Sequence, residues 1–141
     1  MEVPLIWCQM FTKRDEAILL AYLCNRRNML KRRGKLPKDG WMYCTTATVQ
    51  KDSKLNKHAQ ARILKSLEAA GLIKRAYEPL PNKKGKGRDA RWIKVMRKRI
   101  HKVTQMFRLG DPAFNKLRRA TAKTLSAMEK SPMDSKYGRT G

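Results

Sequence analysis

The sequence predicts a mainly α-helical domain with a small β-hairpin. Residues 55–70 place apolar side chains at helical spacing, and Gly71 follows them as a helix stop. Residues 72–76 and 91–96 alternate in side-chain type with a period of two, and the prolines and glycines between them are typical of a hairpin tip. Together these patterns favour several helices packed against one hairpin.

A C-terminal helical extension follows this domain. Asp111 and Pro112 predict its start, because aspartate caps orphan N–H groups and proline suits the first helical turn. We therefore expect one domain over residues 1–108, a helix over residues 109–130 and a flexible tail over residues 131–141. The sparse apolar stripe of the helix suits docking on the domain or on a second copy of the chain, as in a homodimer.

The N-terminal part of the chain predicts two further helices and one strand. Thr12 and Asp15 have the spacing of a capping pair, which predicts the start of a helix over residues 17–30. Residues 41–44 alternate aromatic and smaller side chains and predict a short strand. A brief helix then continues to about Asp52.

Threonines begin this brief helix. Thr45 or Thr46 can cap it, with Val49 turned toward the core. The alternative for one of these hydroxyls is contact with a phosphate, and Thr46 is a candidate for that contact. Ser53 and Lys54 form the turn into the next helix.

The helix over residues 56–70 has two different faces. Asn56 is a preferred N-cap, since its side-chain oxygen can accept a bond from a backbone N–H one turn later. The side expected to face the core consists of Gln60, Ile63, Leu64 and Leu67. The opposite side consists of Lys57, His58, Ala61, Arg62, Lys65 and Ala69. Small and basic side chains suit a helix inserted in a major groove, and a solvated basic face is the simpler alternative.

A resemblance to a known family rests on three segments. These are WMYCTT at residues 41–46, LNKHAQARILKSLEAAGLIKR at residues 55–75, and RWIKV at residues 91–95, after a loop rich in Pro, Lys and Gly. Over roughly residues 12–96 the chain resembles a winged helix-turn-helix DNA-binding domain of phage and plasmid replication proteins and bacterial regulators. The resemblance implies that the helix over residues 56–70 enters the major groove of duplex DNA and that the hairpin forms a basic wing.

The charge of the chain also predicts a polyanionic partner. Its 34 Lys and Arg outnumber its 11 Asp and Glu, which gives a net charge of +23, and residues 1–30 contribute only +1 of it. We expect double-stranded DNA to be that partner. The residues expected to contact it are Thr46, Asn56, Lys57, His58, Arg62, Lys65, Lys83, Lys84, Lys86, Arg88 and Arg97.

Catalysis, metal binding and membrane insertion are not predicted. The sequence has no Gly-rich phosphate loop with its Lys-Ser/Thr, no nucleophile set and no carboxylate cluster, so we expect neither an enzyme nor a cofactor. Cys8, Cys24 and Cys44 lack CxxC spacing, and neither His58 nor His101 lies at ligand spacing from them, so buried reduced thiols are expected. The first residues suit neither a membrane span nor a signal peptide, which favours a cytoplasmic, nucleoid-associated protein.

Several functions within nucleic-acid binding stay open. The resemblance implies either a replication protein that recognises an origin or a transcriptional regulator that recognises an operator. The high charge would equally suit a non-specific DNA coat or a protein that binds structured RNA. Single-stranded RNA is disfavoured, because most of the three Trp, three Phe and four Tyr are expected in the core, which leaves no stacking platform.

Overall fold

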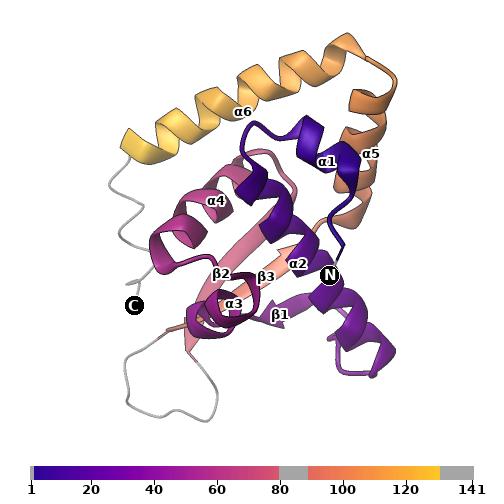
Figure 1. The fold of residues 1–141 in the computed structure, drawn as a ribbon. Coiled ribbons are helices and arrows are strands. Elements are labelled where there is room, and N and C mark those ends of the chain that lie inside the picture. The colour runs from indigo at the N-terminus through magenta and orange to yellow at the C-terminus, as the bar shows by residue number, and fades with distance from the viewer. Residues whose placement is uncertain (1, 80–88, 131–141) are drawn as a thin grey trace.

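A computed structural model of the chain describes residues 2–79 and 89–130. Helices form most of it, and one three-stranded antiparallel sheet completes it (Figure 1), so the expected class of α structure with a small β component is confirmed. The elements in chain order are α1 (Leu5–Met10), α2 (Arg14–Arg32), β1 (Trp41–Tyr43), α3 (Thr46–Ser53), α4 (Lys57–Ala69), β2 (Ile73–Pro79), β3 (Asp89–Val95), α5 (Arg97–Arg108) and α6 (Pro112–Lys130). The expected hairpin tip and tail lie outside the described residues.

The sheet has one face toward the helices and one face away from them. β3 lies in the centre, paired with β1 on one side and with β2 on the other. Along β3, Arg91, Ile93 and Val95 are buried, whereas Trp92 and Lys94 are only half-buried. Alternate side chains of a strand point to opposite faces, so the buried set lies on the inner face and the half-buried set on the outer face.

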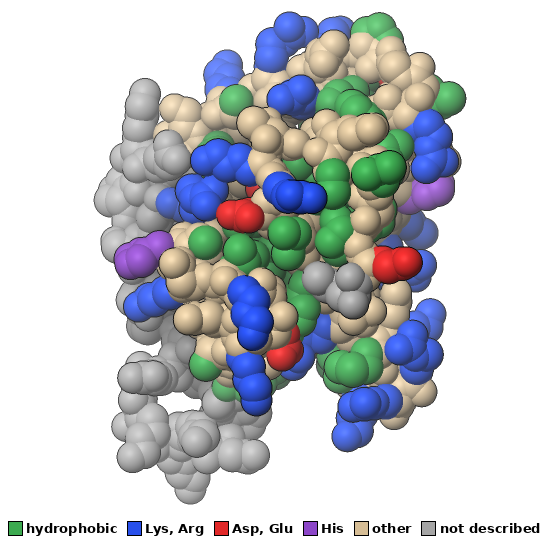
Figure 2. Space-filling model, viewed as in Figure 1, with side chains coloured by type: hydrophobic (Ala, Val, Ile, Leu, Met, Phe, Trp, Pro, Cys, Tyr) green, Lys and Arg blue, Asp and Glu red, His purple; other side chains and the backbone are tan. Residues whose placement is uncertain are grey.

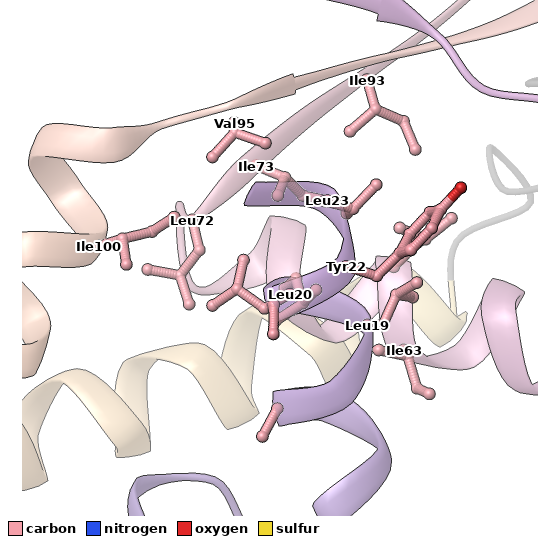
Figure 3. Close-up of a cluster of buried hydrophobic side chains, with 14 of the residues drawn as sticks. Leu19, Leu20, Tyr22, Leu23, Ile63, Leu72, Ile73, Ile93, Val95 and Ile100 are labelled. Atoms are coloured by element: carbon pink, nitrogen blue, oxygen red, sulfur yellow. The ribbon is translucent and has the colours of Figure 1, made fainter. Parts of the chain in front are cut away.

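The hydrophobic core fills the space between α2, α4 and the inner face of the sheet. Figure 3 shows Leu20 and Leu23 of α2 among the strand residues Ile73, Ile93 and Val95. These five side chains are at most 5% exposed. α4 adds Ile63, Leu64 and Leu67 to this core and packs against both α2 and β2.

The start of α2 differs from the prediction. Thr12 and Asp15 do not cap this helix, which begins at Arg14 instead. Glu16 takes the capping role, because its Oε1 accepts a hydrogen bond from the backbone N–H of Lys13 (3.3 Å) while its Oε2 accepts one from the Ser66 hydroxyl (2.7 Å). The first bond is local and caps the helix, and the second comes from Ser66 of α4 and holds the same carboxylate in place.

The short helix α1 was not predicted, yet its aromatic residue anchors the N-terminus. Trp7 and Met10 are buried, and Phe11 packs against the core. The Trp7 indole N–H donates to the Thr104 hydroxyl of α5 (3.1 Å). This bond joins the two ends of the folded domain.

Three aromatic side chains lie on the outer face rather than in the core. Met42 is buried on the inner side of β1, so its neighbours Trp41 and Tyr43 point outward. Tyr43 pairs across the strands with Trp92, and their ring centroids are 5.4 Å apart. The expectation that most aromatics occupy the core is therefore wrong for these three. A period of two identifies two faces of a strand, but it does not tell which face the helices cover.

A hydrogen bond between α2 and α3 gives a first testable prediction. The Tyr22 hydroxyl donates to Asp52 Oδ2 (2.8 Å), and burial, reinforced by this bond, raises the pKa of Tyr22 from 10.0 to about 12. Folding therefore favours the protonated hydroxyl, and this stabilisation is complete below pH 10 and is lost as the pH rises through about 12. We expect Tyr22→Phe to lower the free energy of unfolding by about 1 kcal/mol at neutral pH.

Urea unfolding of the wild type and Tyr22→Phe at neutral and alkaline pH measures this effect. The difference between the two proteins should shrink toward zero as the pH passes from 10 to 12. A difference that does not change with pH would contradict the assignment.

The cysteines of the chain are not paired with one another. All three cysteines are free thiols, with Cys44 buried and Cys8 and Cys24 half-buried. Burial raises the pKa of Cys44 and raises that of Cys24 to about 11, so these two thiols stay protonated at neutral pH. Within residues 2–79 and 89–130, no three His, Cys, Asp or Glu come together as metal ligands, and no helix has the length and apolar character needed to cross a bilayer.

Candidate nucleic-acid interface

The start of α4 is fixed by local hydrogen bonds. The expected cap is confirmed, because Asn56 Oδ1 accepts a bond from the backbone N–H of Ala59 (2.9 Å). α3 begins in the same way, with Thr45 Oγ1 accepting from the Thr48 N–H (3.1 Å). Between the two helices Lys54 adopts a left-handed conformation (φ 68°), which makes the turn short. The first turn of α4 is therefore held in one orientation relative to α3.

The two faces of α4 are those that its sequence predicts. Its inner stripe, Gln60, Ile63, Leu64 and Leu67, is at most 1% exposed. On the other side Lys57, His58, Ala61 and Arg62 are exposed, and Lys65 is half-buried. Gly71, at φ 79°, ends the helix in the left-handed region that glycine adopts without a Cβ penalty. The result is a rigid helix with a cationic N-terminal half on its solvent side.

A buried polar network supports this helix from behind. The Gln60 side chain is fully buried, and its Nε2 donates to the backbone carbonyls of Leu55 (2.9 Å) and Thr46 (3.1 Å). Its Oε1 accepts from Nη2 of Arg91 on β3 (3.0 Å), and Arg91 Nε donates to the Cys44 carbonyl (2.9 Å). Burial lowers the pKa of the Arg91 guanidinium. One glutamine and one arginine thus connect α3, α4, β3 and the end of β1.

Sequence reasoning missed this network, although two signals pointed to it. Gln60 falls on the apolar stripe of its helix, and Arg91 falls on the inward side of an alternating strand. A buried polar side chain needs a partner, and two such positions in one small domain can satisfy each other. Arg91 therefore explains why a polar residue, Gln60, lies on the apolar stripe of α4.

Carboxylates near α4 already have partners. Glu68 Oε1 accepts from Nε (2.9 Å) and Nη2 (2.7 Å) of Arg75 on β2, and the Arg75 side chain is only 5% exposed. Glu16, as described above, accepts from Ser66. Neither carboxylate forms an ion pair with Lys57 or Arg62 on the exposed side. The electrostatic character of this side is therefore cationic.

The C-terminal helix docks on the domain itself. α6 crosses the top of Figure 1 and packs against α4 and α5. Its start is as predicted, since Asp111 Oδ1 accepts from the Ala113 N–H (2.9 Å). Phe114 is buried with its ring 5.1 Å from that of Phe107, and Arg118 donates to the Thr12 hydroxyl (3.1 Å). Of the two docking modes expected for this helix, the single chain adopts the intramolecular one.

A groove of about 640 Å³ remains between α6 and the rest of the domain. Its lining includes the apolar side chains Leu117 and Leu125 of α6, together with Arg62 and Lys65 of α4. Figure 2 shows hydrophobic side chains gathered in the middle of this side of the molecule, with Lys and Arg side chains around them. α6 therefore flanks the second half of α4, while the N-terminal half lies clear of the groove apart from Ala61 and Arg62.

The predicted contact residues are not all brought together. Asn56, Lys57 and His58 lie in the first turn of α4, and Thr46 lies beside it, because its carbonyl accepts from Gln60. Arg97 lies near Cys24 of α2 instead. The expected wing residues Lys83, Lys84, Lys86 and Arg88 lie outside the described residues.

Comparisons of the chain with protein-family models, with curated proteins and with solved structures give no significant match.

Proposed function

We propose that this chain is a winged helix-turn-helix protein that binds duplex DNA. In this proposal α3 and α4 form the helix-turn-helix, α4 enters the major groove, and the β2–β3 hairpin is the wing. The observation that carries the proposal is the capped, rigid α4, whose solvent side presents Lys57, His58, Ala61 and Arg62. Small and cationic side chains at the start of a helix suit close approach to base edges and phosphates.

Two further observations support the proposal. The order helix, strand, helix, helix, hairpin, with the sheet order β1-β3-β2, is that expected of a winged helix domain. The net charge of +23 favours a polyanion. Such a protein would act in the cytoplasm at the nucleoid, at an origin in replication or at an operator in transcription. Structured RNA is the alternative partner.

Substitution of the first turn of α4 tests the proposal. We expect Lys57→Ala with His58→Ala to weaken duplex binding about 10-fold at near-physiological salt, because the helix loses its leading contacts. The dependence of log K on log salt should also become shallower by about one. Fluorescence anisotropy with a labelled duplex, selected from a random pool, measures both quantities.

A matched control is available on α5. His101 and Lys102 are the same two residue types, are also exposed and lie on another helix. His101→Ala with Lys102→Ala removes the same side chains and should change the affinity less than twofold. Equal losses in the two double variants would mean that binding follows total charge, as in a non-specific coat. An unselected pool bound as tightly as the selected duplex would also favour a coat, and tighter capture of structured RNA would replace duplex DNA as the partner.

A further inference from the structure

The outer face of the sheet combines aromatic and cationic side chains in adjacent cross-strand rows. Tyr43, Trp92 and Ala76 form one row across β1, β3 and β2. Trp41, Lys94 and Lys74 form the neighbouring row on the same face. In a sheet, such rows lie about 7 Å apart. The two indoles therefore lie diagonally opposite, beside two lysines.

A hollow of about 370 Å³ lies between these indoles. Trp41 and Trp92 line it together with Ala76, whose small side chain leaves the space between the rings open, and Pro37 and Asp39 complete the lining. Asp39 Oδ1 accepts a hydrogen bond from the backbone N–H of Trp41 (3.2 Å). The carboxylate thus holds Trp41 in place, and its second oxygen could accept a bond from an exocyclic amino group of a base.

The exposure of these residues suits a ligand that stacks. Tyr43 is 38% exposed and is one of the few large hydrophobic side chains so exposed in the described part of the chain. The indole N–H of Trp92 is buried, and no described residue accepts a hydrogen bond from it. Lys74 is exposed, and the Lys94 side chain lies along the turn at Gly40. Flat π-surfaces are therefore available beside positive charge.

We propose that this outer face is a second binding site, which takes the bases of single-stranded nucleic acid. Bases would stack on Tyr43, Trp92 and Trp41, while Lys74 and Lys94 would contact the phosphates. Aromatic side chains next to cations bind single strands in a sequence-tolerant way, because every base offers a π-face. A duplex does not offer its bases for stacking, so this site is independent of the α4 surface proposed for duplex DNA.

Tryptophan fluorescence tests this proposal directly. The chain has three tryptophans, and Trp7 is buried, with its indole N–H bonded to Thr104 of α5. In a Trp7→Phe variant the emission therefore comes from Trp41 and Trp92 alone. Titrating that variant with short oligo(dT) should quench the emission, and a duplex of equal length should quench it far less. Adding Tyr43→Ala should raise the Kd for oligo(dT) about 10-fold and leave the duplex Kd unchanged.

The matched control replaces another exposed hydrophobic side chain. Leu109 is 78% exposed in the turn before α6, and Leu109→Ala should leave oligo(dT) binding unchanged. A second pair compares Lys94→Gln with Lys116→Gln of α6, and only the first should weaken oligo(dT) binding beyond the common effect of one charge. None of the four substituted residues, Tyr43, Leu109, Lys94 and Lys116, belongs to the buried core, so folding is preserved.

Three results would overturn the proposal. The first is equal oligo(dT) binding by the Tyr43→Ala and Leu109→Ala variants. The second is equal quenching by duplex and single strand. The third is that the wild type self-associates and that Tyr43→Ala abolishes this self-association but leaves oligo(dT) binding intact. That result would assign the face to a second copy of the chain. If oligo(dT) binds as expected but no duplex binds, the duplex proposal fails and this one stands.

Discussion

Gln60→Leu is expected to lower the free energy of unfolding by about 3 kcal/mol, although leucine is similar in size and apolar. The substitution removes both donors to the carbonyls of Thr46 and Leu55 and the acceptor for Arg91. The buried guanidinium and the two buried carbonyls then lack hydrogen-bond partners. The free-energy cost of these missing bonds is larger than the stabilisation from burying the apolar leucine side chain. Urea unfolding followed by circular dichroism measures the change.

Gln50 provides the matched control for this experiment. It is an exposed glutamine on α3, and Gln50→Leu should change the stability by less than about 0.5 kcal/mol. Combining Gln60→Leu with Arg91→Met should recover part of the loss, because replacing both members of a buried polar pair by apolar groups is much less costly than removing one. If the two changes instead add, Gln60 and Arg91 act independently and the network does not exist as a unit.

Releasing α6 is expected to strengthen duplex binding by roughly 30-fold, a factor equal to about 2 kcal/mol at 25 °C. Leu117→Asp with Leu125→Asp places two carboxylates in the apolar lining of the groove, which should detach this part of α6. Arg62 is exposed and Lys65 is half-buried, and both line the groove beside α6, so detaching α6 would let a duplex approach both side chains from this side. Each can add a contact of about 1 kcal/mol to DNA, which accounts for the size of the gain.

The charge change needs its own control, since two added carboxylates alone would weaken binding to a polyanion. Ala120→Asp with Ala127→Asp makes the same change at exposed positions of α6 and should lower the affinity slightly. In the released background, Arg62→Ala with Lys65→Ala should abolish the gain. In the wild-type background the same pair should have a much smaller effect. A lower affinity in both aspartate variants would mean that α6 does not obstruct α4.

The elements that the sequence predicts well are those with short-range causes. The Asn56 cap, the Thr45 cap and the start at Asp111 are hydrogen bonds within three residues, so their residue types reveal them. The buried stripe of α4 likewise follows from helical spacing. A local pattern is sufficient for these features because the interaction it encodes is itself local.

The features that the sequence did not predict depend on distant partners. The Glu16 carboxylate, which caps the start of α2, also accepts a hydrogen bond from Ser66, 50 residues away. Arg91 is buried because Cys44 and Gln60, 47 and 31 residues away, accept its hydrogen bonds. The placement of α6 on α4, and the outward direction of Trp41 and Trp92, depend in the same way on which surfaces meet. The spacing of residue types along the chain does not show which distant surfaces pack against each other.

The central position of β3 has a consequence for how the two proposed surfaces would influence each other. Arg91 and Trp92 are consecutive residues, yet one supports α4 from the inner face and the other lies in the outer aromatic row. If a ligand on one face of the sheet shifts β3, the shift would therefore be transmitted to the other face through the single peptide unit between Arg91 and Trp92. Linkage requires such a coupling to be reciprocal: if occupancy of the outer face changes the affinity of α4 for duplex, duplex must change the affinity of the outer face by the same factor.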